Sequence, residues 1–151
     1  MSLKHTDDSR RIVAQAEKYA RGTKQALDSA HFLLALARVP SPAQDLLRDA
    51  GVTSERLIRS LKSLSTQTEA PEILEYLWSR AEQLASQYKL QEVPATVVLA
   101  ALLRLKDSRA CRALNESGVS IVRLRPQVIG RLTSESNRRR IGRGHPRKLS
   151  S

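Results

Sequence analysis

Few residues of this chain have the chemistry of a catalyst or a ligand, and they lie far apart along the sequence. His31 begins an apolar run and would be the natural base or metal ligand, but the other two histidines, His5 and His145, stand near the ends of the chain. We expect these ends to be flexible, so neither histidine offers His31 a local partner. We therefore interpret His31 as a structural residue that bonds to backbone groups near a helix start.

The single cysteine and a pair of glutamates give no catalytic site either. Cys111 has no second cysteine with which to form a disulfide or a metal site. It falls on the apolar face of a predicted helix, where we expect a buried small side chain rather than a nucleophile. Glu17 and Glu82 occupy equivalent places in two similar stretches, and we expect each to pair with a nearby arginine on a solvated face. The sequence predicts no enzymatic activity, no cofactor and no metal ion.

Basic residues are concentrated at the C-terminal end. The net charge is +11, and residues 131–151 contain seven Lys/Arg and one acidic residue, which makes this segment +6. The segment has too few apolar residues to form a core, so we predict a disordered basic tail over residues 133–151. Its stretch Arg-Gly-His-Pro-Arg-Lys, residues 143–148, is similar to the AT-hook, a minor-groove DNA element centred on Arg-Gly-Arg-Pro, with His145 in place of the second arginine.

The tail supports more than one interpretation. Its candidate nucleic-acid-binding residues are Arg138, Arg139, Arg140, Arg143, Arg147 and Lys148. In this interpretation the cations contact phosphate groups, and binding would weaken steeply with salt. In the other interpretation the tail keeps the protein soluble or contacts an acidic protein surface.

The elements that must position these residues form an internal repeat. Residues 29–36 and 46–52 return about 65 residues later as residues 94–101 and 113–119. Identity between the copies is low, but the matches fall on apolar and glycine positions, where a shared fold would require them.

Each copy of the repeat predicts four helices. Apolar residues recur every three or four positions, and polar residues or prolines suited to helix starts precede each segment. The first helix is expected from Ser9 to Gly22, with Gly22 in the left-handed conformation that ends a helix, and Pro126 interrupts or begins the last one. No stretch alternates as a strand would. We predict an all-α fold of eight helices in two pseudo-symmetric repeats, about 9–64 and 71–132, which form one globular domain over residues 9–132.

Neither the N-terminus nor the longest apolar run of the chain indicates a membrane protein. The N-terminus is polar and has no apolar core of a signal peptide. The longest apolar run, Val97–Leu103, has seven residues, far fewer than the roughly 20 needed to cross a bilayer. We expect a cytoplasmic protein with no membrane contact.

The repeated block resembles the Clp N-terminal domain, also called the Clp R domain, which stands at the front of the Clp/Hsp100 AAA+ unfoldases. In that family a short polar pair, a histidine and an apolar helix are followed by a small helix that ends in Gly-Val. Here the same order is given by residues 29–36 and by Gly51-Val52. The resemblance covers about residues 9–132, and it implies a helical double repeat with a groove between its halves.

The chain departs from this family in ways that limit what the resemblance implies. The family usually has glutamate immediately before the histidine, and here Ala30 and Ala95 occupy those positions, while Thr96 replaces the second histidine. In some members that carboxylate takes part in binding phosphorylated arginine, which an alanine cannot do. The phosphate-binding pattern Gly-x4-Gly-Lys-Ser/Thr is absent, so we expect a free-standing module without an ATPase.

The resemblance implies a non-enzymatic protein-interaction module, an accessory or adaptor linked to a Clp unfoldase or protease. Its partner would be a Clp-family ATPase, an adaptor or a client. We expect His31, Trp78 and Thr96 to line the protein-binding groove, with Trp78 as an anchor if it is not simply core. The alternative is a nucleic-acid-associated regulatory protein that uses the arginine-rich tail. A third hypothesis is a helical nucleic-acid binder that uses Arg123, Arg125 and Arg131.

Overall fold

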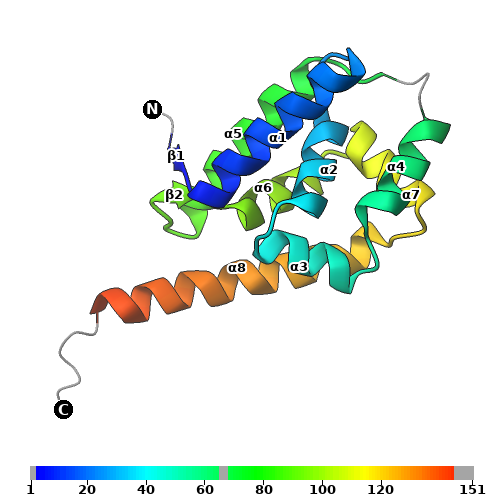
Figure 1. Ribbon diagram of the computed structural model, residues 1–151. Coiled ribbons are helices and arrows are strands. Elements are labelled where there is room, and N and C mark those ends of the chain that lie inside the picture. Colours follow the sequence, from blue (N-terminus) through cyan, green and yellow to red (C-terminus); the bar gives the residue numbers. More distant parts are fainter. Residues whose placement is uncertain (1–2, 65–67, 145–151) are drawn as a thin grey trace.

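The computed structural model describes residues 3–64 and 68–144, with side chains as far as Ser136. Over these residues the predicted all-α fold is confirmed, and the chain forms eight helices with two very short strands (Figure 1). The elements are, in order, β1 (Lys4–His5), α1 (Asp7–Thr23), α2 (Ser29–Arg38), α3 (Pro42–Asp49), α4 (Ser54–Ser63), α5 (Glu72–Gln87), β2 (Glu92–Val93), α6 (Ala95–Leu102), α7 (Arg109–Glu116) and α8 (Ile121–Gly144).

Polar side chains begin most of the helices, as the sequence predicts. The Ser41 hydroxyl accepts a hydrogen bond from the Gln44 N–H at 3.2 Å, and Pro42 takes the first helical position, where no backbone donor is needed. The same arrangement of a side-chain oxygen and a free N–H occurs at the other helix starts with a polar cap. These caps are Thr6, Asp28, Thr53, Ser108 and Ser120.

The end of α1 differs from the prediction. Gly22 lies inside the helix, and it is Lys24 that adopts the left-handed conformation, with φ 56°. The last carbonyls of the helix are satisfied without a glycine, because the Lys24 N–H bonds to Arg21 and the Gln25 N–H bonds to Ala20. The Thr23 hydroxyl also donates to the Tyr19 carbonyl at 3.0 Å.

The core is built around α6, every residue of which is buried. This helix packs against α1, α2, α3, α5 and α8 and so lies inside the bundle (Figure 1). A helix that is apolar on all sides needs neighbours on all sides, which the two repeats together supply. The remaining core is mostly leucine, alanine and valine, with Phe32 as the one buried phenylalanine among the described residues.

The structure adds a small sheet that the sequence did not predict. Lys4 pairs with Glu92 and His5 with Val93 in a parallel ladder, and the Thr6 N–H donates to the Val93 carbonyl at 3.1 Å. Each strand has only two residues, too short to show the alternation from which a strand is predicted. The pairing ties the N-terminal segment to the second repeat, so His5 does not lie in a flexible end.

The last helix is longer than predicted. α8 begins at Ile121 and runs through Pro126 and past Leu132, where we expected the domain to end, as far as Gly144. Pro126 is exposed, and the carbonyl that loses its helical donor belongs to Val122, a residue on the solvent side of the helix. The final turns project beyond the body (Figure 1). None of the described helices is long and apolar enough to cross a membrane.

Candidate functional site

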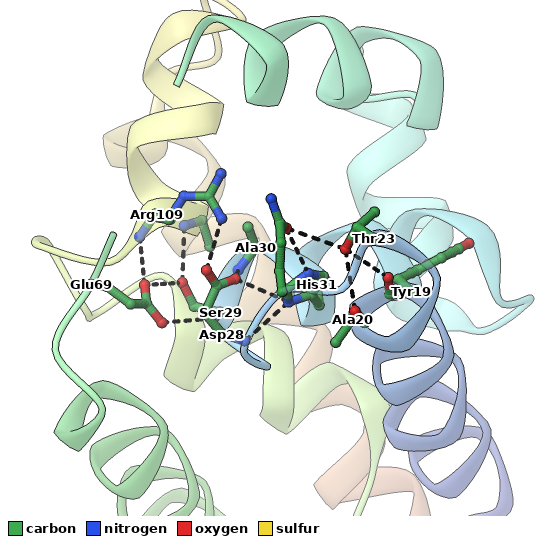
Figure 2. A network of polar contacts seen from close by, with 11 residues as sticks. Tyr19, Ala20, Thr23, Asp28, Ser29, Ala30, His31, Glu69 and Arg109 are labelled. Atoms are coloured by element: carbon green, nitrogen blue, oxygen red, sulfur yellow. Dashed lines mark hydrogen bonds and ion pairs between the residues drawn. The ribbon is translucent and has the colours of Figure 1, made fainter. Parts of the chain in front are cut away.

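A polar network joins the two repeats around the carboxylate of Glu69, which precedes α5 (Figure 2). One carboxylate oxygen accepts the Ser29 N–H at 2.7 Å, and the other accepts the Ser29 hydroxyl at 2.6 Å and the Arg109 N–H at 2.7 Å. The Ser29 hydroxyl in turn accepts the Ala110 N–H at 3.0 Å. One negative charge therefore satisfies the unpaired N–H groups at the starts of α2 and α7, where helix dipoles favour it.

An ion pair reinforces the same junction. The Arg109 guanidinium lies 2.7 Å from the Asp28 carboxylate, and its side chain is only 6% exposed. Burial alone would raise the pKa of Asp28, but its contacts with His31 and Arg109 outweigh burial and hold the pKa below its ordinary value of 3.8. The ion pair stabilises the packing of α2 against α7, although the buried Arg109 Nε has no hydrogen-bond partner among the described residues.

His31 has the structural role expected from the sequence. Its Nδ1 accepts the Asp28 N–H at 3.0 Å, and its Nε2 lies 3.3 Å from the Gln25 side-chain oxygen. The Asp28 carboxylate also lies 3.2 Å from Nδ1, so His31 and Arg109 together hold the pKa of Asp28 low. At 6% exposure His31 is too buried to meet a partner.

The corresponding place in the second repeat lacks these backbone donors. In the register of the repeat, Pro94 stands where Ser29 stands in the first half, and Pro42 stands where Arg109 stands in the second. Proline has no N–H, so neither position can donate to a carboxylate. The two junctions between the halves are therefore chemically different.

A carboxylate is nevertheless present at the second junction. Glu135 of α8 accepts the Thr96 hydroxyl at 3.4 Å and pairs with Arg131 at 3.3 Å. Beside it is a pocket of about 390 Å³ whose lining includes Pro42 and Pro94. Thr96 is 1% exposed, so it supports the wall of this pocket rather than a docking surface.

A larger groove lies between α1 and α5, with a volume of about 640 Å³. We call it the α1–α5 groove. Trp78 is half-buried in it and is held by edge-to-face contacts with the rings of His5 at 5.3 Å and Phe32 at 5.2 Å. Such contacts fix the indole in one orientation. The residues that line the groove are Leu3, His5, Arg10, Val13, Ala14, Glu17, Trp78 and Glu82.

The charged groups of the α1–α5 groove are not paired as the sequence suggested. Glu82 accepts the Leu3 N–H at 3.3 Å rather than an arginine, and Glu17 makes no hydrogen bond or ion pair within the described residues. Burial is the main reason why the pKa of His5 falls below its ordinary value of 6.5; Glu82 opposes this shift and Arg10 adds to it. The groove thus combines apolar side chains with two carboxylates and with the guanidinium of Arg10, which pairs with Asp7.

The three residues predicted to line one protein-binding groove lie in three different places. His31 is buried beside the Glu69 network, Thr96 is buried at the second junction, and only Trp78 opens onto a groove. The sequence did not indicate Glu69 or Arg109, because Glu69 falls in a polar stretch without periodicity and lies 40 residues from both of its partners. Only the packing of one repeat on the other brings them together.

The candidate nucleic-acid-binding residues of the tail divide into two groups. Arg138, Arg139, Arg140 and Arg143 lie on the last turns of α8, beyond the last described side chain. Arg147 and Lys148 lie outside the described residues. Their nucleic-acid role stays a prediction.

No described part of the chain assembles a catalytic centre. Cys111 is buried, and burial raises the pKa of its thiol, so the neutral form dominates at neutral pH. The described residues hold no group of three His, Cys, Asp or Glu side chains that could bind a metal ion. Of the places where the three predicted groove residues lie, the α1–α5 groove has the geometry of a binding surface.

The sequence matches no protein-family profile and no curated protein. Similar solved structures include the N-terminal domain of the caseinolytic protease associated chaperone ClpD from Arabidopsis thaliana, which is 20% identical with a TM-score of 0.73, over 85% of this chain and 94% of that one. For the Hsp104 N-terminal domain from Candida albicans the identity is 21% and the TM-score 0.65, over 83% and 89% of the two chains.

A third similar structure comes from structural investigations of a malarial protein secretion system. It is 18% identical with a TM-score of 0.68, over 85% of this chain and 95% of that one. At identities this low the similarity establishes the fold. The chain has the fold of the Clp N-terminal domains, as the resemblance of its repeated block predicted.

Proposed function

We propose that this protein is a non-enzymatic interaction module that docks a segment of a Clp-family ATPase, an adaptor or a client. The observation that carries the proposal is the α1–α5 groove with Trp78 fixed in its wall. The fold supports the partner class, since the similar structures include N-terminal domains of the chaperones ClpD and Hsp104. We place this docking role in the cytoplasm.

The groove favours a partner segment of definite chemistry. Its floor offers Val13, Leu3 and the indole of Trp78 to an apolar side chain, and tryptophan is a frequent binding anchor at protein interfaces. The carboxylates of Glu17 and Glu82 favour a lysine or arginine beside that apolar residue. We expect an extended or helical segment with one large apolar residue next to a basic one.

A binding assay with two matched pairs of variants tests this proposal. The full chain is immobilised, and purified Clp ATPase from the native cell is passed over it. Trp78→Ala should weaken binding about tenfold or more, as expected for an interface anchor. Tyr76→Ala on the same helix should leave binding unchanged, because Tyr76 is 60% exposed outside the groove.

The second pair separates groove chemistry from damage to the fold. Glu17→Lys reverses an exposed charge that has no partner within the described residues, and it should weaken binding without changing thermal stability. Glu116→Lys makes the same change at the exposed end of α7 and should have no effect on binding. If neither Trp78→Ala nor Glu17→Lys alters the binding of a Clp ATPase, adaptor or client, the groove is not the docking site. If the wild-type chain binds no Clp ATPase, no adaptor and no client, the proposal fails.

A further inference from the structure

A second groove has the opposite charge. It lies between α1 and the turn that joins α2 to α3, with a volume of about 620 Å³. We call it the basic groove. Its lining includes Arg11, Lys18, Arg21 and Arg38, with the half-buried Tyr19 among them, and it includes no carboxylate.

The four cations of the basic groove are exposed and unpaired. The side chains of these four residues make no hydrogen bond or ion pair with the side chains and backbone described for residues 3–64 and 68–136. Elsewhere the chain pairs exposed arginines with carboxylates on the same helix, as in Arg48 with Asp45 on α3. Arg11 also borders the pocket at the second junction, where Asp7, Asp8 and Glu135 lie, so the positive potential is concentrated at Lys18, Arg21 and Arg38. An anionic partner would neutralise it.

The spacing of the basic residues along α1 places their charges in a row. Arg11, Lys18 and Arg21 share one face of the helix and span about 15 Å, because each helical residue advances about 1.5 Å. Arg38 adds a fourth cation from the end of α2, on the other side of the groove. Lys18 and Arg21 are three residues apart, so their charges repel each other until an anion lies between them.

We infer that the basic groove binds the phosphate backbone of nucleic acid, without selecting a base sequence. Three of the four cations are arginines, whose guanidinium groups bind phosphate oxygens in a bidentate manner. Apart from the half-buried Tyr19, the apolar part of the lining consists of Ala14, Val39 and Pro40, and it has no counterpart of Trp78 in the α1–α5 groove. Contacts to phosphate position a protein on nucleic acid but do not read its sequence.

The charge of the rest of the chain favours a long polyanion over an acidic protein. Residues 131–151 form a second basic segment of net charge +6. A nucleic acid carries the same charge at every step along its length, so it presents phosphate groups to each basic region that it meets. An acidic protein would need two separate patches in the matching arrangement. This role is independent of the α1–α5 groove.

Fluorescence anisotropy with a labelled duplex DNA of about 20 base pairs tests the inference on the full chain, between about 50 and 200 mM salt. The groove variant is Lys18→Ala/Arg21→Ala/Arg38→Ala. The control variant, Arg59→Ala/Lys62→Ala/Arg80→Ala, removes the same charge from exposed positions on α4 and α5. A tail variant, Arg138→Ala/Arg139→Ala/Arg140→Ala, measures the second basic segment separately.

We expect the groove variant to bind at least tenfold more weakly at about 100 mM salt, and its slope of log K against log salt to be smaller by about 2 to 3, since each phosphate contact contributes about 0.9. The control should change both quantities much less. Equal losses in the groove and control variants would mean that only net charge matters and would overturn the inference. It would also be overturned if the groove variant bound DNA normally, or if polyglutamate bound the wild-type chain more tightly than DNA does.

Discussion

At the scale of single residues, the Glu69 carboxylate connects the two halves of the fold. It accepts hydrogen bonds from the starts of two helices that belong to different repeats. Its partner Ser29 is fully buried, and removal of the carboxylate deprives the Ser29 N–H and hydroxyl of the acceptor that the fold supplies. Buried donors without acceptors are among the more expensive defects in a protein.

We expect Glu69→Ala to lower the free energy of unfolding by about 2 to 4 kcal/mol, because it leaves two helix N–H groups and one hydroxyl without their acceptor. Urea denaturation followed by circular dichroism measures the change. Glu116→Ala is the control, since Glu116 is exposed and has no partner within the described residues, and it should shift stability by less than about 0.5 kcal/mol. Equal stability of the two variants would show that the network contributes little.

His5 should make stability depend on pH in a defined window. Its pKa in the folded protein is below 6.5, so the unfolded chain binds the proton first as the pH falls. The stability present above pH 6.5 is then lost progressively as the pH falls from 6.5 toward the lowered folded value. In His5→Gln the free energy of unfolding should fall less between neutral and mildly acidic pH than in the wild type. A steeper fall in the variant would contradict the assigned direction of the shift.

At the scale of helices, the sequence was enough to predict where most helices begin, but not where α1 ends. Caps such as Ser41 act through bonds to the next turn, which the local sequence contains. The end of α1 depends on whether Lys24 can adopt positive φ while its N–H reaches the Arg21 carbonyl, a matter of backbone geometry that composition does not reveal. The β1–β2 ladder and the length of α8 depend on tertiary contacts in the same way.

Two glycine substitutions test this account of the helix ends. Gly22→Ala should stabilise the protein by about 0.5 to 1 kcal/mol, because Gly22 lies inside α1 with open space around its Cα. Gly118→Ala should destabilise it by about 1 to 2 kcal/mol, because Gly118 has φ +80° and a side chain is strained there even with space available. Thermal unfolding of both variants gives the signs. Destabilisation by Gly22→Ala would mean that Gly22, not Lys24, ends the helix.

The end of the packed body lies within α8. Val128 and Leu132 are fully buried, and the Ser136 hydroxyl donates to the Tyr88 carbonyl at 2.8 Å. A chain that ends at Ser136 should unfold within about 0.5 kcal/mol of the full chain, as expected for a change outside the core. A chain that ends at Gln127 loses two buried aliphatic side chains and should be less stable by about 4 kcal/mol or more. Urea midpoints distinguish these outcomes, and equal stability of the two shortened chains would place the end of the core before Val128.

At the scale of the whole molecule, the sequence predicted the architecture better than the sites. The apolar spacing in each copy was enough for an all-α double repeat, because a helix face that must be buried leaves a regular pattern. The α1–α5 groove, the basic groove and the Glu69 network all arise where segments distant in sequence meet. A groove lined by Glu17 and Trp78 has no signature in either helix taken alone.

Pro42 and Pro94, the two prolines of the second junction, show how far the two halves of the chain have diverged. If the halves arose by duplication, they have since lost their interchangeability: two copies of the first half would place Pro42 at the position of Arg109, and the helix there could not donate to Glu69. Neither half could now be replaced by a second copy of the other. Each half now supplies a backbone donor that the other half lacks at the equivalent position. A substitution that removes the donor at Ser29 or Arg109 therefore has to be compensated elsewhere in the Glu69 junction.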